Sequence, residues 1–359
     1  MTTDSGEQRG RASPAARAVR DLDPACFAFV MATGIVSTGM SLLGPSWLSL
    51  ALLAAACAGL AVLGAAFAAR LVLFRANLAA DLRAPDRAFG FFTITAALDV
   101  LGLRFALARH PLATAILAAP AALAWLLLTY GVPASLMLAR TRDSVLADVD
   151  GSWLLWIVAT ESLSIAAATV VPVWPGQAGL LAPVAASLWC VGLVLYLMVA
   201  TLILLRWFTI PVRPEAVGPS NWILMGATAI TVLAGANLLG LTANLPVVRA
   251  TSGFVSGFTF TLWAFGSWWI PLLVIIGLWH IRRHWPPTYE LALWSIVFPL
   301  GMYGVATLTF GKAANLRFMA PLARFVFWVA VAAWVLVAVA FVRSATKPAR
   351  AAKAAKANV

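Results

Sequence analysis

Residues 25–43 read ACFAFVMATGIVSTGMSLL, a run that contains no charged side chain. An α-helix rises 1.5 Å per residue, so about 20 apolar residues are enough to cross the roughly 30 Å hydrocarbon core of a bilayer. Thr33, Ser37 and Ser41 recur at intervals of four residues, which places them on one face of such a helix. The stretch therefore predicts a membrane-spanning helix with a single polar stripe.

The composition of the whole chain agrees with this interpretation. Of its 359 residues 62% are hydrophobic and only 11% are charged, whereas about a quarter of a soluble domain is charged. This balance excludes a soluble enzyme, a disordered chain and a coiled coil. Cys26, Cys57 and Cys190 have no paired spacing, and the sequence contains no HExxH, GxSxG or Walker motif. We therefore expect no catalytic residues, no cofactor and no bound metal.

Nine further apolar stretches resemble the first, so we expect ten spans. None shows the period-two alternation of barrel strands, and the fold class is therefore predicted to be an all-α integral membrane protein. Turn residues such as Gly and Pro separate many of the stretches. The expected spans are 25–43, 47–69, 88–103, 112–136, 152–171, 179–205, 220–240, 254–279, 289–310 and 319–342.

The basic residues predict the orientation. With the N-terminus in the cytoplasm, the cytoplasmic segments hold 19 of the 25 Lys and Arg residues, as the positive-inside rule requires. Both termini are then cytoplasmic, which fits an even number of spans. The net charge of +12 is thus mainly an orientation signal, and not a sign of nucleic-acid binding. The domains expected are a basic N-terminal segment (1–24), a membrane domain (25–342) and a basic C-terminal tail (343–359).

Odd-numbered and even-numbered spans differ in their polar residues. The second and tenth spans are almost purely apolar, as expected of helices that face lipid, whereas the odd spans carry hydroxyl groups at helical spacing. The eighth span is an exception, because it is also rich in Ser and Thr. The pattern predicts five inner helices wrapped by five outer ones, around an axis that is either packed or open as a pore. Alternatively, the hydroxyl groups only cement helix packing. The candidate pore-lining residues are Thr33, Ser37, Thr95, Thr160, Glu161, Ser164, Thr228, Thr231, Ser295 and Met302.

Two acidic residues fall inside the spans, where an unpaired charge costs roughly 2.5 kcal/mol or more. Glu161 lies about nine residues, or roughly 14 Å, into the fifth span and has no basic residue near it in sequence. It is therefore either a pore-facing or protonated carboxyl group, or a structural one. Asp99 lies in the outer half of the third span, where Arg104 or Lys312 could form an ion pair with it.

Five stretches of the chain resemble one known family. They occur in order at 27–37 (FAFVMATGIVS), 89–93 (FGFFT), 153–160 (WLLWIVAT), 222–228 (WILMGAT) and 293–303 (LWSIVFPLGMY). These stretches are similar to the tellurite-resistance/C4-dicarboxylate transporter family, which includes bacterial malate-transport homologues and plant guard-cell slow anion channels. The resemblance runs from about residue 24 to about residue 340.

The resemblance implies ten helices built as five tandem hairpins around a pseudo-fivefold pore. Odd helices line that pore, and the assembly is a homotrimer with one pore per subunit. It also implies that a phenylalanine on the ninth helix plugs the pore, and the matching residue is Phe298. Pro299 follows directly and leaves the carbonyl of Ser295 without its helical donor, so a kink beside the ring is expected. Where bacterial members tend to have Gln, this chain has Glu161.

We therefore expect a channel or transporter of the bacterial inner membrane that passes small anions. The anions that the resemblance implies are C4-dicarboxylates (malate among them), chloride, nitrate, sulfite and tellurite-related oxyanions. The lining residues do not single out one of them. Two alternatives stay open. One is a proton-coupled dicarboxylate exporter that uses Glu161, and the other is a non-conducting membrane scaffold or sensor. The expected partners are the lipid bilayer and small anions.

Overall fold

The structure, a computed structural model, describes residues 13–138, 146–211, 218–241, 245–283 and 289–357, with residues 283 and 346–357 described by their backbone alone. Every regular element in these ranges is a helix, which confirms the predicted fold class. Ten helical segments of the described chain are long and apolar enough to cross a membrane, which confirms the predicted number.

The ten spans form five consecutive helical hairpins. In each hairpin a helix of 16 to 20 residues is followed by one of 28 to 39 residues that packs against it. The outer helices continue beyond the expected limits; the backbone of the last one is helical past residue 342. The pairs are α2 (Ala28–Leu43) with α3 (Ser46–Leu73), α6 (Phe92–Leu107) with α7 (Pro111–Leu138), α8 (Leu155–Val170) with α9 (Ala178–Thr209), α10 (Ile223–Leu239) with α11 (Pro246–Arg283), and α12 (Trp294–Ala313) with α13 (Met319–Ala357).

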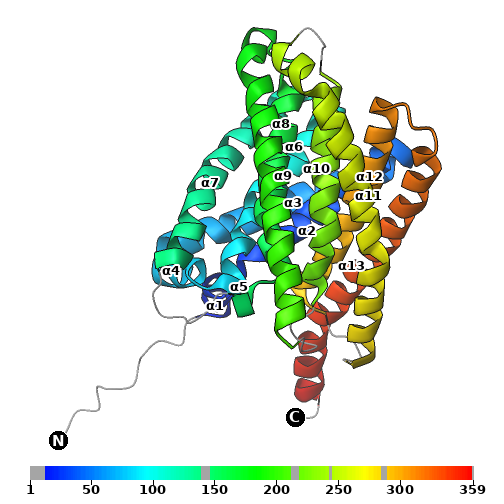
Figure 1. Cartoon of the computed structure of the whole chain (residues 1–359). Coiled ribbons are helices and arrows are strands. Elements are labelled where there is room, and N and C mark those ends of the chain that lie inside the picture. The colour runs from blue at the N-terminus through cyan, green and yellow to red at the C-terminus, as the bar shows by residue number, and fades with distance from the viewer. Residues whose placement is uncertain (1–12, 139–145, 212–217, 242–244, 284–288, 358–359) are drawn as a thin grey trace, which may run out of the picture.

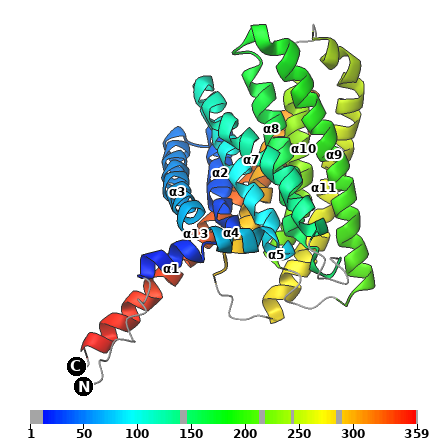
Figure 2. The ribbon, with the colours of Figure 1, turned by 90° about the vertical axis from the view of Figure 1, so that its left-hand side faces the viewer.

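The first helices of the five hairpins contact one another in a closed cycle. The order is α2, α6, α8, α10, α12 and back to α2, and we call these five the inner ring. Between 72% and 83% of the residues in their apolar windows are buried, against 11% to 39% for the second helices, which we call the outer ring. Long outer helices accordingly lie on the outside of the bundle in both views (Figures 1 and 2).

All inner helices begin at the same end of the bundle. We call this the proximal end; it also holds the short helices α1 (Pro14–Arg20), α4 (Arg75–Leu82) and α5 (Pro85–Ala88), and the opposite end is the distal end (Figure 1). A 3₁₀ turn precedes each inner helix, and the five turns contact one another in the same cyclic order as the helices. They are η1 (Pro24–Phe27), η2 (Phe89–Phe91), η4 (Gly151–Leu154), η7 (Pro219–Trp222) and η8 (Leu291–Leu293).

A buried ionic cluster fixes the proximal connection between the first two hairpins. Arg70, at the end of α3, donates to Asp81 of α4 at 2.5 Å and to the backbone carbonyl of Arg20 at 3.0 Å. Arg87 of α5 approaches the other oxygen of Asp81 at 3.1 Å. Because Asp81 is shared by two guanidinium groups, α4 and α5 are held against the end of α3.

Candidate functional site

A cavity of about 900 Å³ opens at the distal end, among the ends of α6, α8, α10 and α12. Arg109 and Lys312 are the charged residues of its lining, and both are basic. Thr169, Asn237 and Thr309 add polar groups. We call this cavity the vestibule. These two basic side chains give the lining a positive charge, and none of the described residues that line it is acidic.

Backbone geometry at the vestibule rim is unusual. Arg109 has φ of 62° and Asn315 has φ of 56°, values in the left-handed region that Gly and Asn adopt most easily. Both residues follow the end of an inner helix and form Schellman motifs, with 6→1 bonds from His110 to Phe105 and from Leu316 to Gly311. The strained backbone at Arg109 therefore turns the chain sharply at the point where its side chain lines the vestibule.

A stripe of residues on α12 leads from the vestibule into the bundle. Seven residues make about two helical turns, so Lys312, Val305 and Phe298 lie on one face of the helix, with Met302 between the last two. Phe298 is only 2% exposed. On α10, Gly226 lies two such seven-residue steps before Gly240 of the vestibule, so it falls on the same face of that helix. The α12 stripe between the vestibule and Phe298 carries apolar side chains.

The helices approach closely beside Phe298. Pro299 lies inside α12, and a Cβ atom added to Gly226 would be only 2.7 Å from the Pro299 ring. Glycine therefore allows α10 to pack directly against the proline turn. Ser295, whose carbonyl would otherwise accept from residue 299, lies half-buried in the first turn of α12.

Several hydroxyl groups of the inner helices bond to the outer ring. Indole N–H groups of outer helices donate to inner threonines, from Trp334 to Thr33 at 3.1 Å and from Trp125 to Thr160 at 2.8 Å. The indole of Trp189 instead donates to the backbone carbonyl of Thr231 at 3.0 Å. These bonds direct the Thr33 and Thr160 hydroxyl groups toward the outer helices.

The other candidate hydroxyl groups also have partners. Thr95 and Ser164 donate to backbone carbonyls of α7 and α9, at 3.3 Å and 2.8 Å. Thr228 and Thr231 donate to carbonyls of their own helix, α10, at 2.7 Å and 2.9 Å. Ser37 exchanges hydrogen bonds with Ser49 of α3 at 2.8 Å in each direction. These hydroxyl groups therefore contribute to packing within and between helices.

Asp99 and Arg104 bind hydroxyl groups. Asp99 accepts a hydrogen bond from Ser162 of α8 at 2.8 Å, and the described residues provide no ion pair for it. Arg104 instead donates to Ser37 and Ser49 at 2.9 Å to 3.2 Å. The expected ion pair between Asp99 and either Arg104 or Lys312 is therefore absent from the described part of the chain, and Asp99 links α6 to α8.

Glu161 lies at the interface of α8 with the outer helix α9. It is fully buried, and its carboxyl group packs so closely on Gly192 that a Cβ atom there would collide with it. Neither carboxyl oxygen has a hydrogen-bond partner among the described residues. The carboxyl group thus lies where α8 meets α9, with Thr231 of α10 also close to it.

At the proximal end, Asp150 joins two of the 3₁₀ turns. It accepts bonds from the backbone N–H and hydroxyl of Ser152 in η4, at 3.0 Å and 2.5 Å, and from the hydroxyl of Ser220 in η7, at 3.0 Å. Burial raises the pKa of Asp150, and these hydrogen bonds lower it in part. In the described part of the chain, no group of three or more His, Cys, Asp or Glu residues is arranged to hold a metal ion.

Two features of this site were not predicted from the sequence. The first is that Arg109 and Lys312 line the vestibule together; basic vestibules were expected, but a left-handed turn is predicted from Gly or Asn, and here Arg109 occupies it. The second is the series of indole bonds, although Trp on even spans and Thr on odd spans were a visible signal. A search for Trp and Thr at matching depth in consecutive spans would have suggested these pairs.

Comparisons with known proteins agree with this architecture. Residues 21–342 match the SLAC1 family, described as voltage-dependent anion channel. An uncharacterized membrane protein of Mycobacterium tuberculosis is 46% identical over 147 residues, which are 41% of this chain and 74% of the relative. An uncharacterized transporter of Methanocaldococcus jannaschii is 26% identical over 296 residues, 79% of this chain and 82% of the relative. Together with the ten spans, these similarities identify a multi-pass membrane protein.

Proposed function

Because this chain belongs to the SLAC1 family of voltage-dependent anion channels, the family that its five sequence stretches resemble, we propose that it passes small anions along the axis of the inner ring, with Phe298 as the gate. The observation that carries this proposal is the α12 stripe, which leads from the basic vestibule to a buried phenylalanine beside a proline.

Positive groups lie at both ends of the proposed path. Arg109 and Lys312 attract anions at the distal end, where they offset the partial negative charge of the inner-helix C-termini. At the proximal end the five inner helices begin around one ring of 3₁₀ turns, and each helix N-terminus carries roughly half a positive charge. An anion approaching from either side therefore meets a favourable potential before it reaches the apolar part of the path.

The gate acts through size and hydration. A large apolar ring at a constriction blocks an ion sterically and also excludes the water that would accompany it. Pro299 removes one helical hydrogen bond next to the ring, so a small change in the backbone or in the Phe298 rotamer opens the path. Met302 lines the path on the distal side of the gate. The threonine and serine hydroxyl groups hold the two rings together around it.

We assign the proximal end to the cytoplasm and the chain to the bacterial inner membrane, so that the segments 1–24 and 343–359 are cytoplasmic. A homotrimer with one pore per subunit is the proposed assembly. A vestibule of about 900 Å³ has room for C4-dicarboxylates (malate among them) and for chloride, nitrate, sulfite and tellurite-related oxyanions. A cavity of this size selects by charge and dehydration more than by fitted contacts.

One second candidate is supported by a specific observation. Phe298 is buried, so a protein whose axis stays packed, as in a scaffold or sensor, also fits the structure. A proton-coupled exporter that uses Glu161 is less well supported, because that carboxyl group packs against Gly192 of the outer ring.

Ionic current through a voltage-clamped planar bilayer tests the proposal. Phe298→Ala should raise the anion current about tenfold or more, equivalent to a barrier lowered by about 1.4 kcal/mol. Phe310→Ala is the matched control, since Phe310 is buried on the same helix but lies off the stripe. An unchanged current in Phe298→Ala, with protein present in the bilayer, would overturn the gate, and silence toward every anion would favour the scaffold.

A further inference from the structure

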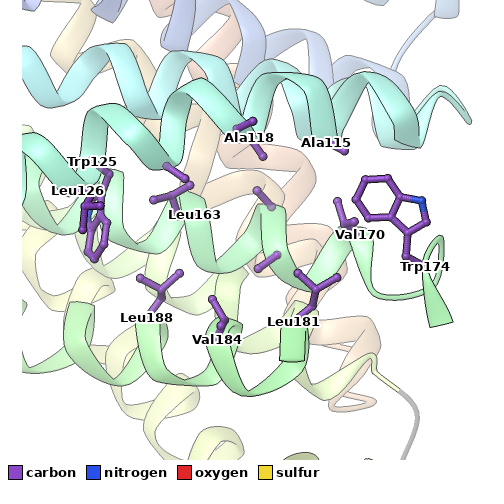
Figure 3. A pocket seen from close by; sticks show the side chains of 14 residues that line it. Ala115, Ala118, Trp125, Leu126, Leu163, Val170, Trp174, Leu181, Val184 and Leu188 are labelled. Carbon is purple, nitrogen blue, oxygen red and sulfur yellow. The ribbon is translucent and has the colours of Figure 1, made fainter. Parts of the chain in front are cut away.

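Two apolar grooves of similar size run along the outside of the bundle. The first, of about 440 Å³, lies in the distal half between α7 and α9, over α8, and all its lining side chains are apolar or aromatic (Figure 3). The second, of about 520 Å³, lies between α3 and α7, over α6, and α4 contributes residues to its proximal end. We call them the distal groove and the proximal groove.

The proximal groove is long enough to span one leaflet. Along α7 its lining extends over residues 120–135, which is about 22 Å at 1.5 Å per residue. Half of a hydrocarbon core is about 15 Å thick. The groove therefore exceeds one leaflet in length and has room for an acyl chain of a lipid in the proximal leaflet.

Charge distinguishes the two grooves. Arg83, next to the end of α4, is the charged residue that lines the proximal groove; it is exposed and has no ion pair among the described residues. Of the two nearby acids, Asp81 is engaged by Arg70 and Arg87, and Asp86 forms no ion pair with Arg83 in the described part of the chain. The proximal end of this groove thus offers an uncompensated guanidinium group at the depth of the lipid headgroups.

The helix junction under the proximal groove differs from the one under the distal groove. Under the distal groove, Trp125 of α7 donates to Thr160 of α8. Within the described residues no such indole bond joins α3 to α6; Arg104 donates to Ser49 toward the distal end, and near the groove Phe67 and Phe91 make an edge contact with ring centroids 6.0 Å apart. An apolar molecule in the proximal groove would therefore add contacts to the proximal part of this junction, which is held by apolar packing.

We propose that the proximal groove binds one anionic phospholipid, with an acyl chain along α7 and the phosphate at Arg83. A guanidinium group binds phosphate through two parallel hydrogen bonds, and the adjacent chain buries apolar surface of Phe67 and Ile94. The bound lipid fills the space between the first two hairpins. This site is independent of the proposed ion path, because it lies outside the inner ring.

Native mass spectrometry of the purified full-length protein tests the site. Phosphatidylglycerol and phosphatidylcholine with identical acyl chains are added in equal amounts, and the retained lipid is counted. The wild type should retain one phosphatidylglycerol with about fivefold preference, the contribution of one basic residue near a membrane surface. Arg83→Gln should abolish this preference, and Arg83→Lys should keep part of it, because the charge remains while the paired hydrogen bonds are lost.

A matched pair of variants on α7 provides a second test with the charge intact. Ala124→Phe fills the proximal groove and should remove the retained lipid, whereas Ala118→Phe fills the distal groove and should leave it bound. Retention of phosphatidylglycerol by Arg83→Gln or Ala124→Phe at the wild-type level would overturn the proposal. A changed subunit number in Ala124→Phe with an unchanged lipid count would also overturn it, and would assign the groove to a second copy of the chain.

Discussion

The inner and outer rings of this protein differ in their exposure and in the polar side chains that they carry. Inner helices are largely buried and carry hydroxyl and carboxyl groups, whereas outer helices are largely exposed and carry the tryptophans that donate to inner ones. Trp125, Trp263 and Trp334 each reach from one hairpin to the inner helix of the next. The outer ring is therefore not only a lipid-facing cover, because it also satisfies polar groups of the inner ring.

Glycines on both rings allow polar side chains of one ring to pack closely against the other. A Cβ atom at Gly192 would collide with Glu161, one at Gly266 with Thr228, and one at Gly235 with Thr259. In each case a polar side chain of one ring lies against the bare backbone of the other. Close contact of this kind is how helices associate in membranes, where no hydrophobic force drives them together.

The largest effect on stability is expected at the contact of Glu161 with α9. Gly192→Ala should destabilise the protein by about 1–3 kcal/mol, because an overpacked buried site must shift to accept the methyl group. Thermal unfolding in detergent measures the loss. Gly179→Ala on the same helix is the control, since a Cβ there meets nothing within 4 Å. Adding Glu161→Ala to Gly192→Ala should restore stability; equal stability of the two glycine variants would contradict the close contact.

A smaller effect is expected from removing one indole bond between the rings. Trp263→Phe loses the 3.0 Å bond to Thr307 and should cost about 0.5–1.5 kcal/mol of stability. Trp328→Phe, on the exposed side of α13, should change little. Combining Trp263→Phe with Thr307→Val should recover part of the loss, because neither polar partner then remains; a double variant with the summed loss would argue against the pairing.

The smallest change in stability, with a separate change in function, is expected at the vestibule. Arg109→Gly relieves the left-handed backbone and should stabilise the fold by up to about 1 kcal/mol. The same change removes one of the two vestibule charges, so anion current should fall, most clearly at low ionic strength. Asn315→Gly makes the equivalent backbone change without altering charge. If both variants reduce the current equally, the vestibule charge is not the cause.

The sequence predicted the ten spans because the bilayer demands long apolar stretches, and α2 and α10 fall where their apolar residues begin and end. It did not predict where polar side chains point. The partner of Asp99 is Ser162, 63 residues away, and the space for Glu161 is created by Gly192 on the next helix. Such contacts depend on how helices rotate about their own axes, which periodicity alone does not fix.

The same rotation determines which candidate side chains face the path and which face the outer ring. Phe298 and Met302 lie on a stripe that reaches the vestibule, so both stay predictions as residues of the path. The polarity of Thr160 predicts a pore-lining residue, whereas its hydroxyl group accepts a hydrogen bond from Trp125 of the outer ring. Polar residues on one face of a membrane helix show that this face requires hydrogen-bond partners. Those partners are supplied either by another helix or by water.

Cysteine modification in the Phe298→Ala background tests the central claim most directly. With Cys26, Cys57 and Cys190 replaced, Met302→Cys and Thr160→Cys are compared by the anion current before and after a negatively charged thiol reagent is added at the distal side. The proposed path predicts that the reagent suppresses the current through Met302→Cys and leaves Thr160→Cys unchanged. Suppression in Thr160→Cys with no effect in Met302→Cys would contradict an ion path along the α12 stripe.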